Sequence, residues 1–362
     1  MKKFFLTVLL VLLSVLIVVG CSSPTGNENE NEESQAGEAP EGNSENQNSA
    51  EKEKKTINIS VLGSPQNTTT QVLYTFKEEL ESLADGQIEV VIHHSGSLYG
   101  QDADERAVLR GNLEMTYVDA ASVAAHLPEA SMYNAAYMWK NYEHMNAALS
   151  GEIGQEFFEK VASEVGYRPL AAFYHGDRQL NYRDVGREIR TPEDVQGLVL
   201  RMPNNRAMIF IGEAMGASVT PLAFGEVYTG LSTGTIDAQD NSMEVTIDHK
   251  FYEVTDYVSL TNHVVDSLFP IINEDFFQSL GSELQEMVYK AIEITKEEND
   301  NIMLSKREDA IEVLESKGVT VISDVDIEAF MSEIQEKYLN DDISAEWNMD
   351  VFNQIQELAD QF

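Results

Sequence analysis

The sequence predicts an α/β fold divided into two lobes, and three observations favour this prediction. Strand-like and helical segments alternate from residue 56 onward, which is the order that builds a parallel sheet. The chain has 362 residues, which is long enough for two ordinary domains. Residues 282–317 form one helical pattern with no Gly or Pro, about ten turns long. A helix of that length is too long for one small lobe, so we expect it to cross both.

The first half of the body begins as β-α-β. Ile57, Ile59 and Val61 alternate with polar residues, as in a half-buried strand. The next segment has apolar residues at helical spacing, and a second apolar run follows it. Further apolar runs along this half, several of which end at a Gly, predict more strands and helices by the same spacing rules. The expected elements are strands over 56–62, 88–92, 113–118 and 169–174, and helices over 67–84, 102–110, 143–149 and 152–164.

The second half contains shorter strands and the long helix. Ser282 and Gln285 are expected to form a capping box at the start of that helix, and Gly318 is expected to end it. The other expected elements are a strand ending at Arg201, a helix over 226–231, strands over 236–238, 257–260, 268–272 and 319–322, and terminal helices within 326–361.

The N-terminal segment has the pattern of an export signal. Lys2 and Lys3 precede an uncharged apolar run that is short for a membrane span and ends in V-V-G-C at Cys21. This ending resembles the lipobox of bacterial lipoproteins, in which the Cys is lipidated and becomes the mature N-terminus. We predict a lipoprotein signal peptide over 1–20 and a lipid anchor at Cys21. The alternative is an ordinary signal peptide, or a single anchor helix, with an incidental Cys.

Composition limits the remaining possibilities. Residues 21–55 contain the lipidated Cys and a polar tether, which has too few large apolar side chains to fold. Cys21 is the only Cys, so neither an internal disulfide nor a Cys-based metal site is expected. The seven His show no metal-ligand spacing, and we predict no metal and no cofactor. Acidic residues outnumber basic ones 62 to 24, which argues against binding nucleic acid.

One motif suggests an enzyme, but its context does not. Residues 230–234 match G-x-S-x-G, the nucleophile elbow of serine hydrolases. An elbow needs a strand before the Ser and a helix after it. Here a helix is expected before Ser232 and a strand after it, so we predict that the chain is not an enzyme.

Arginines are concentrated in one part of this acidic chain. Residues 178–206 contain six Arg and no Lys, against four acids. Arg178 and Arg201 each follow an apolar run beside Gly or Pro, so both are expected at strand ends, where open α/β sheets bind ligands. We predict that Arg201 holds a carboxylate and that Arg178 also has a ligand role. His175, three residues before Arg178, is a weaker candidate.

Residues 197–241 carry a family resemblance. The segment G-L-V-L-R-M-P (197–203) precedes P-L-A-F-G-E-V-Y-T-G-L-S-T-G-T-I-D-A-Q-D-N (221–241). This pattern resembles the substrate-binding subunits, of DctP type, of tripartite ATP-independent periplasmic (TRAP) transporters. The likeness extends over about 56–340. It implies a two-lobed, type II-like periplasmic-binding-protein fold, with lobe I formed by 56–175 plus 266–305 and lobe II by 176–265 plus 306–362.

The resemblance also implies a ligand site. Arg201 is the principal carboxylate clamp, Arg178 is the second cationic contact, and Asn241 donates its amide to the same carboxylate. Phe224 forms a wall of the pocket, with Asn204 just beyond the clamp. Asp119 matches a position that accepts hydrogen bonds from ligand hydroxyl or amine groups in some members. Three departures from the pattern are expected to affect only loop rigidity: Ala238, Asp240 and Ser242.

The sequence therefore predicts an extracytoplasmic, membrane-anchored lipoprotein that captures an organic acid and delivers it to a TRAP permease. Sugar acids and C4-dicarboxylates both remain possible ligands. Asp119 and His175 slightly favour a hydroxylated acid, because their groups suit hydroxyls. A receptor that reports a bound carboxylate to a sensor protein is the alternative function. We expect a monomer by default.

Overall fold

The computed structural model describes residues 54–362. The predicted signal peptide, Cys21 and all but the last two residues of the predicted tether lie outside this range. Among the described residues, no helix is both long enough and apolar enough to cross a membrane.

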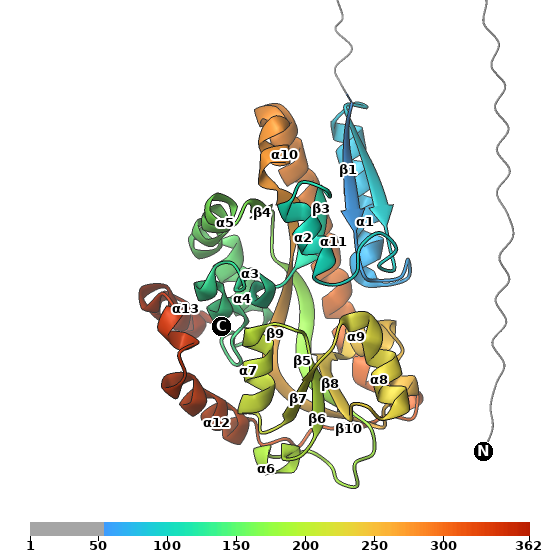
Figure 1. Cartoon of the computed structure of the whole chain (residues 1–362), viewed down its shortest axis with the longest axis vertical. Coiled ribbons are helices and arrows are strands. Elements are labelled where there is room, and N and C mark those ends of the chain that lie inside the picture. The colour runs from blue at the N-terminus through green and yellow to red at the C-terminus, as the bar shows by residue number, and fades with distance from the viewer. Residues whose placement is uncertain (1–53) are drawn as a thin grey trace, which may run out of the picture. The chain divides into compact units, whose positions relative to one another are not determined.

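The strands form one continuous sheet path in the order β2-β1-β3-β9-β5-β8-β6-β7, and β4 and β10 each pair with β9. The prediction of an α/β fold is confirmed, with parallel pairing at both ends of the sheet (Figure 1). The parallel pairing expected from the first β-α-β unit is confirmed for β1 and β2, whereas the central strands β5 and β9 pair antiparallel with each other, and β8, β3 and β4 pair antiparallel with them. The strands are β1 (Lys55–Ser60), β2 (Ile88–His93), β3 (Met115–Val118), β4 (Tyr167–Pro169), β5 (Phe173–Tyr182), β6 (Val199–Met202), β7 (Ser218–Pro221), β8 (Ala238–Ser242), β9 (Tyr257–Asn273) and β10 (Thr320–Ile322).

The central strand β9 joins the two halves of the sheet. Its first part pairs with β10 and β5, and its last part pairs with β3 and β4. The prediction of two short strands in this region was wrong. Polar residues at Thr261 and Asn262 interrupt the apolar pattern, and Asn262 has a positive φ of 44°, yet the strand continues through them. Both halves of the sheet are therefore built on one shared strand.

The strand β5 is also longer than predicted, and it places Arg178 in its interior. Gly176 looked like a strand end, but it has a φ of 93° at a register shift between β5 and β9. A Cβ at this position would lie 2.5 Å from the Cβ of Ser242. Gly176 therefore forms a bulge that lets β5 and β8 approach closely, and the strand continues beyond it.

The helices surround this sheet, and the long helix α11 packs against α1, α9 and β5 (Figure 1). Its predicted extent is confirmed, but its predicted capping box is not. Leu280 is the N-cap, and Gln285 donates instead to the carbonyl of Phe277 in the preceding helix. The helices are α1 (Thr68–Leu83), α2 (Ala103–Leu109), α3 (Ala120–Val123), α4 (Tyr142–Ser150), α5 (Glu152–Glu164), α6 (Pro192–Val195), α7 (Arg206–Ala214), α8 (Val227–Thr233), α9 (Met243–Asp248), α10 (Glu274–Ser279), α11 (Gly281–Ser316), α12 (Ile327–Asn340) and α13 (Met349–Leu358).

The C-terminal helices contact both halves of the body. Helix α12 packs against α7, whereas α13 packs against α4. The ring of His144 in α4 bonds through Nε2 to the carbonyl of Ile355 in α13 at 2.8 Å. The chain therefore returns to the first half at its end, and the lobe boundaries given above stay a prediction.

Candidate functional site

The ends of β1, β3, β6 and β8 surround a cavity of about 140 Å³. Ligands of open α/β sheets bind at this position. Six of the seven predicted ligand-binding residues line the cavity: Arg201, Arg178, Asn241, Phe224, Asp119 and His175. Asn204 does not line it. That side chain is exposed, because the chain turns away after Pro203 to begin α7.

Arg201 reaches the cavity from the end of β6 and is 1% exposed. Its Nε and Nη2 donate to the carbonyl of Leu222 at 2.9 and 2.7 Å, which fixes the plane of the guanidinium. Nη2 also approaches the side-chain oxygen of Gln101 at 3.4 Å. Among the described residues, no carboxylate forms an ion pair with Arg201. A buried cation without a counter-ion is costly, and it provides a position prepared for an external anion.

The surroundings of Arg201 affect its pKa. Burial lowers the pKa to about 10, and the nearby acids, Asp240 foremost, only partly offset that effect. The neighbouring charge of Arg178 lowers it further. The guanidinium still carries its charge at neutral pH. A ligand carboxylate would supply the negative charge that this site lacks.

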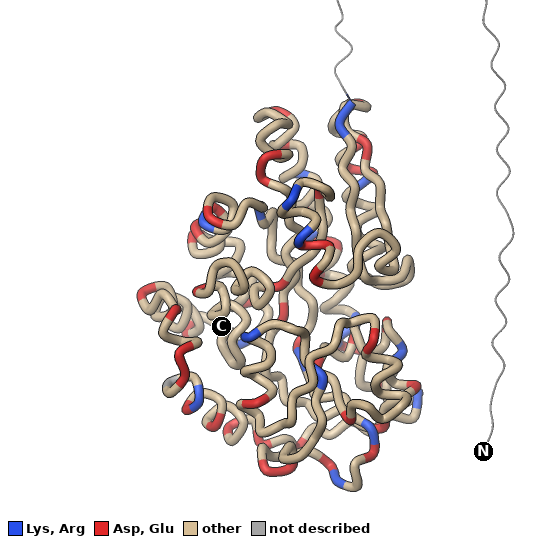
Figure 2. The backbone as a smooth tube through the Cα atoms, viewed as in Figure 1, with Lys and Arg blue, Asp and Glu red and all other residues tan. Residues whose placement is uncertain are grey.

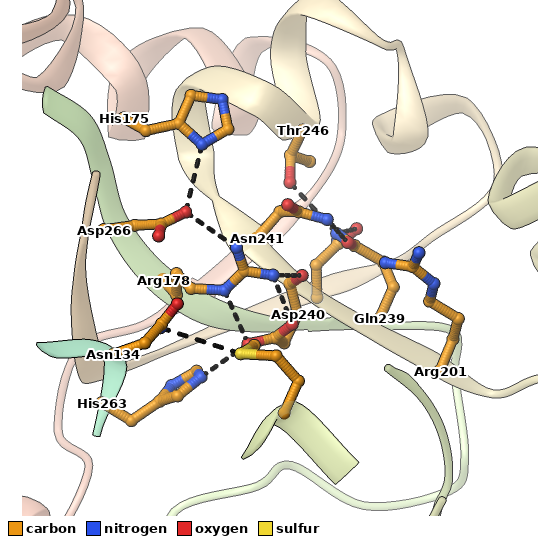
Figure 3. A network of polar contacts seen from close by, with 12 residues as sticks. Asn134, His175, Arg178, Arg201, Gln239, Asp240, Asn241, Thr246, His263 and Asp266 are labelled. Atoms are coloured by element: carbon orange, nitrogen blue, oxygen red, sulfur yellow. Dashed lines mark hydrogen bonds and ion pairs between the residues drawn. The ribbon is translucent and has the colours of Figure 1, made fainter. Parts of the chain in front are cut away.

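Arg178 is buried in the same wall but is fully paired. Its Nε and Nη2 donate to the Asp240 carboxylate at 2.9 and 2.6 Å, and Nη1 donates to Asp266 at 2.8 Å. Asp240 also contacts the buried His263 ring, and Asp266 contacts Nδ1 of His175. In Figure 3, Arg178 lies at the centre of this network, whereas no dashed line joins Arg201 to the other side chains drawn.

The pKa shifts around Arg178 agree with a set of mutually stabilised charges. Burial alone would raise the pKa of Asp240 and Asp266, but Arg178 and the adjacent His residues hold both below the ordinary range. Burial would lower the pKa of Arg178, and the two carboxylates raise it instead. The family pattern suggested that Asp240 affects only loop rigidity. Asp240 instead lies within β8 and is the charge partner of Arg178.

Asn241 and Phe224 complete the side of the cavity near Arg201. The Nδ2 of Asn241 donates to the side-chain oxygen of Gln239, which orients the amide at the end of β8. The Phe224 ring lies over the Arg201 guanidinium, 5.9 Å from its Cζ, and packs edge-on against His249. These contacts hold an apolar wall beside the cation.

Acidic residues also line the cavity. Asp and Glu are spread over the described chain (Figure 2), and Asp102, Asp104, Glu105, Asp119 and Asp266 all line the cavity. Burial raises the pKa of Asp104 to about 6 and that of Glu105 to about 7, and it also raises the pKa of Asp119. At neutral pH Glu105 can therefore donate as well as accept hydrogen bonds.

Sequence reasoning missed several lining residues that lie outside the recognised motifs. Asp104 and Glu105 are in the first turn of α2, where acids are also expected for helix stability alone. For Asp240, which pairs with Arg178 and does not itself line the cavity, the available signal was an acid inside a strand, which needs a cationic partner once the strand is buried. Other polar lining residues that were missed include Asn67, Gln101, His249 and Asp266.

Residues 59–342 match a family model described as bacterial extracellular solute-binding protein, family 7 (DctP). The chain belongs to this family. Its members include the substrate-binding subunits of TRAP transporters, so the predicted recognition is confirmed, and the protein is a transport protein and not an enzyme. In agreement, α8 precedes β8 at the G-x-S-x-G motif, and the Ser232 hydroxyl donates to the carbonyl of Thr229.

Named relatives support this membership. This chain is 32% identical over 288 residues to a solute-binding protein from Roseobacter denitrificans. The match covers 79% of this chain and 87% of the relative. This chain is also 27% identical over 281 residues to the sialic acid-binding periplasmic protein SiaP of Vibrio cholerae, covering 76% and 84%. Both matches cover nearly the whole of the relative.

Solved structures confirm the fold. A TRAP periplasmic solute-binding protein of Roseobacter denitrificans with bound 3-deoxy-D-manno-oct-2-ulosonic acid has a TM-score of 0.80 at 32% identity, covering 84% of this chain and 100% of that chain. A second protein from that organism, with bound L-galactonate, has a TM-score of 0.77 at 29% identity, covering 84% and 99%. The two-lobed fold class predicted from the sequence is therefore confirmed.

Proposed function

We propose that the protein captures an organic acid by closing two lobes around it, with Arg201 as the carboxylate clamp. The observation that carries this proposal is the buried guanidinium of Arg201, which faces the cavity and has no carboxylate partner among the described residues. The planar fork of Arg forms two parallel charge-assisted hydrogen bonds with a carboxylate. Asn241, which lines the cavity and uses one amide hydrogen on Gln239, would donate the other to the same group.

The cavity suits a hydroxylated acid with one carboxylate better than a dicarboxylate. Only one of the two arginines in its wall is free of a protein carboxylate, so only one ligand carboxylate has a matching cation. Asp104, Glu105 and Asp119 in the lining would repel a second carboxylate but would form hydrogen bonds with hydroxyl groups. The relatives with bound 3-deoxy-D-manno-oct-2-ulosonic acid and L-galactonate support a sugar acid.

Delivery would follow from closure. Ligand contacts to lobe I (56–175 plus 266–305) and lobe II (176–265 plus 306–362) would shift the population toward the closed form. A TRAP permease in the membrane would then recognise the closed, loaded protein. Arg178, His175 and their carboxylate partners would keep β5, β8 and β9 in register beside the ligand, with Arg178 as a secondary cationic contact.

The protein would work at the outer face of the cell membrane, held there by lipid on Cys21. The sequence V-V-G-C at residues 18–21 supports this attachment. A Cys21→Ala variant is expected to leave the membrane fraction and appear in the soluble extracytoplasmic fraction. If that variant stays with the membrane to the same extent as the unaltered protein, the proposed anchor is wrong.

A thermal-shift screen tests the proposed function. L-galactonate, 3-deoxy-D-manno-oct-2-ulosonate, succinate and a neutral sugar are each added to the protein and to Arg201→Ala. A ligand present at about 100 times its Kd stabilises the folded state by about 2.7 kcal/mol, which raises Tm by roughly 5 °C for a body of this size. We expect a sugar acid to give the largest shift and Arg201→Ala to lose it. The proposal fails if no acid shifts Tm, or if both proteins respond equally.

A further inference from the structure

A polar cluster joins the first turn of α1 to the end of α9. One Oδ of Asp248 accepts from the backbone N and the Oγ1 of Thr68, both at 3.2 Å, and from Nδ2 of Asn67 at 3.3 Å. The other Oδ accepts from Nζ of Lys306 at 2.7 Å. Lys306 also donates to Oγ1 of Thr68 at 2.7 Å. One carboxylate therefore binds three segments that are far apart in the sequence.

These segments belong to different parts of the fold. Helix α1 covers β2 at one end of the sheet, α9 follows β8 in the other half, and α11, which carries Lys306, packs against both (Figure 1). Asp248 lies in the last turn of α9, where the dipole of its own helix disfavours an acid. The N-terminus of α1 and Lys306 supply the favourable interactions instead. Asp248 is thus stabilised by contacts across the halves and not by its own helix.

The cluster is connected to the cavity through Asn67, but its other members do not line the cavity. Asn67, the N-cap of α1, also lies 3.2 Å from Nε2 of His249 through its Nδ2. His249 packs edge-on against Phe224, with ring centroids 4.6 Å apart, and Phe224 covers Arg201. Asn67 and His249 line the cavity, whereas Thr68, Asp248 and Lys306 do not. A change at Asp248 therefore alters the contact between the halves without removing a group that faces the ligand.

We propose that Asp248, with Thr68 and Lys306, is a latch that holds the two lobes closed and sets the residence time of the ligand. This inference rests on the proposed function, in which the lobes close on an acid. Opening would break the bonds from Thr68 and Asn67 to the Asp248 carboxylate, and the bond from Lys306 to Thr68, together. The ligand can leave only from the open form, so weakening the latch raises the open fraction of the loaded protein and speeds the dissociation of every ligand by the same factor.

The test measures ligand dissociation by stopped-flow displacement, with the sugar acid that gives the largest shift in the thermal screen. We expect Asp248→Ala to increase the dissociation rate about tenfold, which corresponds to about 1.4 kcal/mol, and to change the association rate less than twofold. Lys306→Met is expected to increase it less, because it removes one donor. The double variant should dissociate little faster than Asp248→Ala alone, because both substitutions break the same cluster.

Glu253→Ala is the matched control. It removes the same charge, and its partner Tyr228 lies in the same half of the body, so it should leave the dissociation rate unchanged. The latch is wrong if Asp248→Ala and Lys306→Met dissociate at the unaltered rate while their circular dichroism matches that of the starting protein, or if Glu253→Ala accelerates dissociation as much as Asp248→Ala does. Absence of binding by the unaltered protein would instead contradict the proposed function.

Discussion

The two buried arginines of the cavity wall have opposite electrostatic surroundings. Arg178 donates to Asp240 and Asp266 and is 4% exposed. Arg201 is 1% exposed and, within the described part of the chain, donates only to the carbonyl of Leu222 and, at longer distance, to Gln101. Burial therefore does not distinguish the two side chains. The difference lies in the counter-ion, which the protein supplies to Arg178 and leaves to a ligand at Arg201.

This difference separates a stabilising role from a binding role. A charge that is paired inside the protein contributes mainly to stability, and removing one partner leaves the others buried and unpaired. A charge without an internal partner lowers stability in the free protein and regains that energy when a ligand binds. The two arginines should therefore respond differently to the same substitution.

The largest expected effect is on stability, at Arg178. Arg178→Met leaves the buried carboxylates of Asp240 and Asp266 without their arginine partner, with only the His263 and His175 contacts remaining, and we expect a loss of about 3 to 5 kcal/mol in the free energy of unfolding. Arg201→Met should change it by about 1 kcal/mol or less, because no buried carboxylate loses its partner. Urea unfolding of the ligand-free proteins measures both values. Equal losses would contradict the comparison.

A smaller effect is expected from the acids that face Arg201. Among the described residues, no Lys or Arg pairs with Glu105, and burial raises its pKa from 4.5 to about 7. Its raised pKa in the folded state favours folding below pH 4.5, and this contribution is lost as the pH rises to about 7. Unfolding free energy should therefore fall over this range, by up to about 3 kcal/mol.

Glu105→Gln is the variant that checks this pH dependence. It keeps the shape of the side chain and removes the titrating group, so its unfolding free energy should change less between pH 5 and pH 7.5. Asp104 contributes in the same direction, because its pKa is raised to about 6, and it should leave a residual slope in the variant. Identical slopes for the two proteins would show that Glu105 is not the titrating group.

The smallest expected effect is on the rate of ligand capture. The cation of Arg201 is surrounded by an acidic body, which should slow the approach of an anion until salt screens the repulsion over about 8 to 10 Å. Stopped-flow association rates should therefore rise modestly from low to physiological salt. A steep fall would indicate a basic entry path, and the Arg201 site would then not be the isolated cation described above.

Much of the fold could be predicted from the sequence, because local patterns determine it. The periodicity of residues 282–317 identified α11, and alternation identified β1. Two central features depend on distant contacts. The strand β9 continues through polar residues because β5 pairs along it, and Gly176 bulges because Ser242 lies against it. A single sequence contains no direct signal for either contact.

Most of the site residues that the sequence named line the cavity, but the sequence did not predict with which residues they pair. The motifs brought Arg201, Asn241 and Phe224 to one cavity, as expected. They did not show that Asp240 and Asp266 neutralise Arg178, because these residues are distant in sequence and meet only across strand pairing. The acids of α2 were missed for the same reason, since nothing before Leu113 indicated that they face the arginines.

The central claim is that Arg201 holds the ligand carboxylate through its fork of donors and not through charge alone. Isothermal titration calorimetry of Arg201→Lys, with the sugar acid selected by the thermal-shift screen, tests it directly. Lys keeps the charge but cannot form two parallel bonds to a carboxylate, and loss of a partner in a desolvated pair costs about 2 to 5 kcal/mol. We predict that the affinity falls by roughly a hundredfold or more. Near-normal affinity of Arg201→Lys would contradict the account.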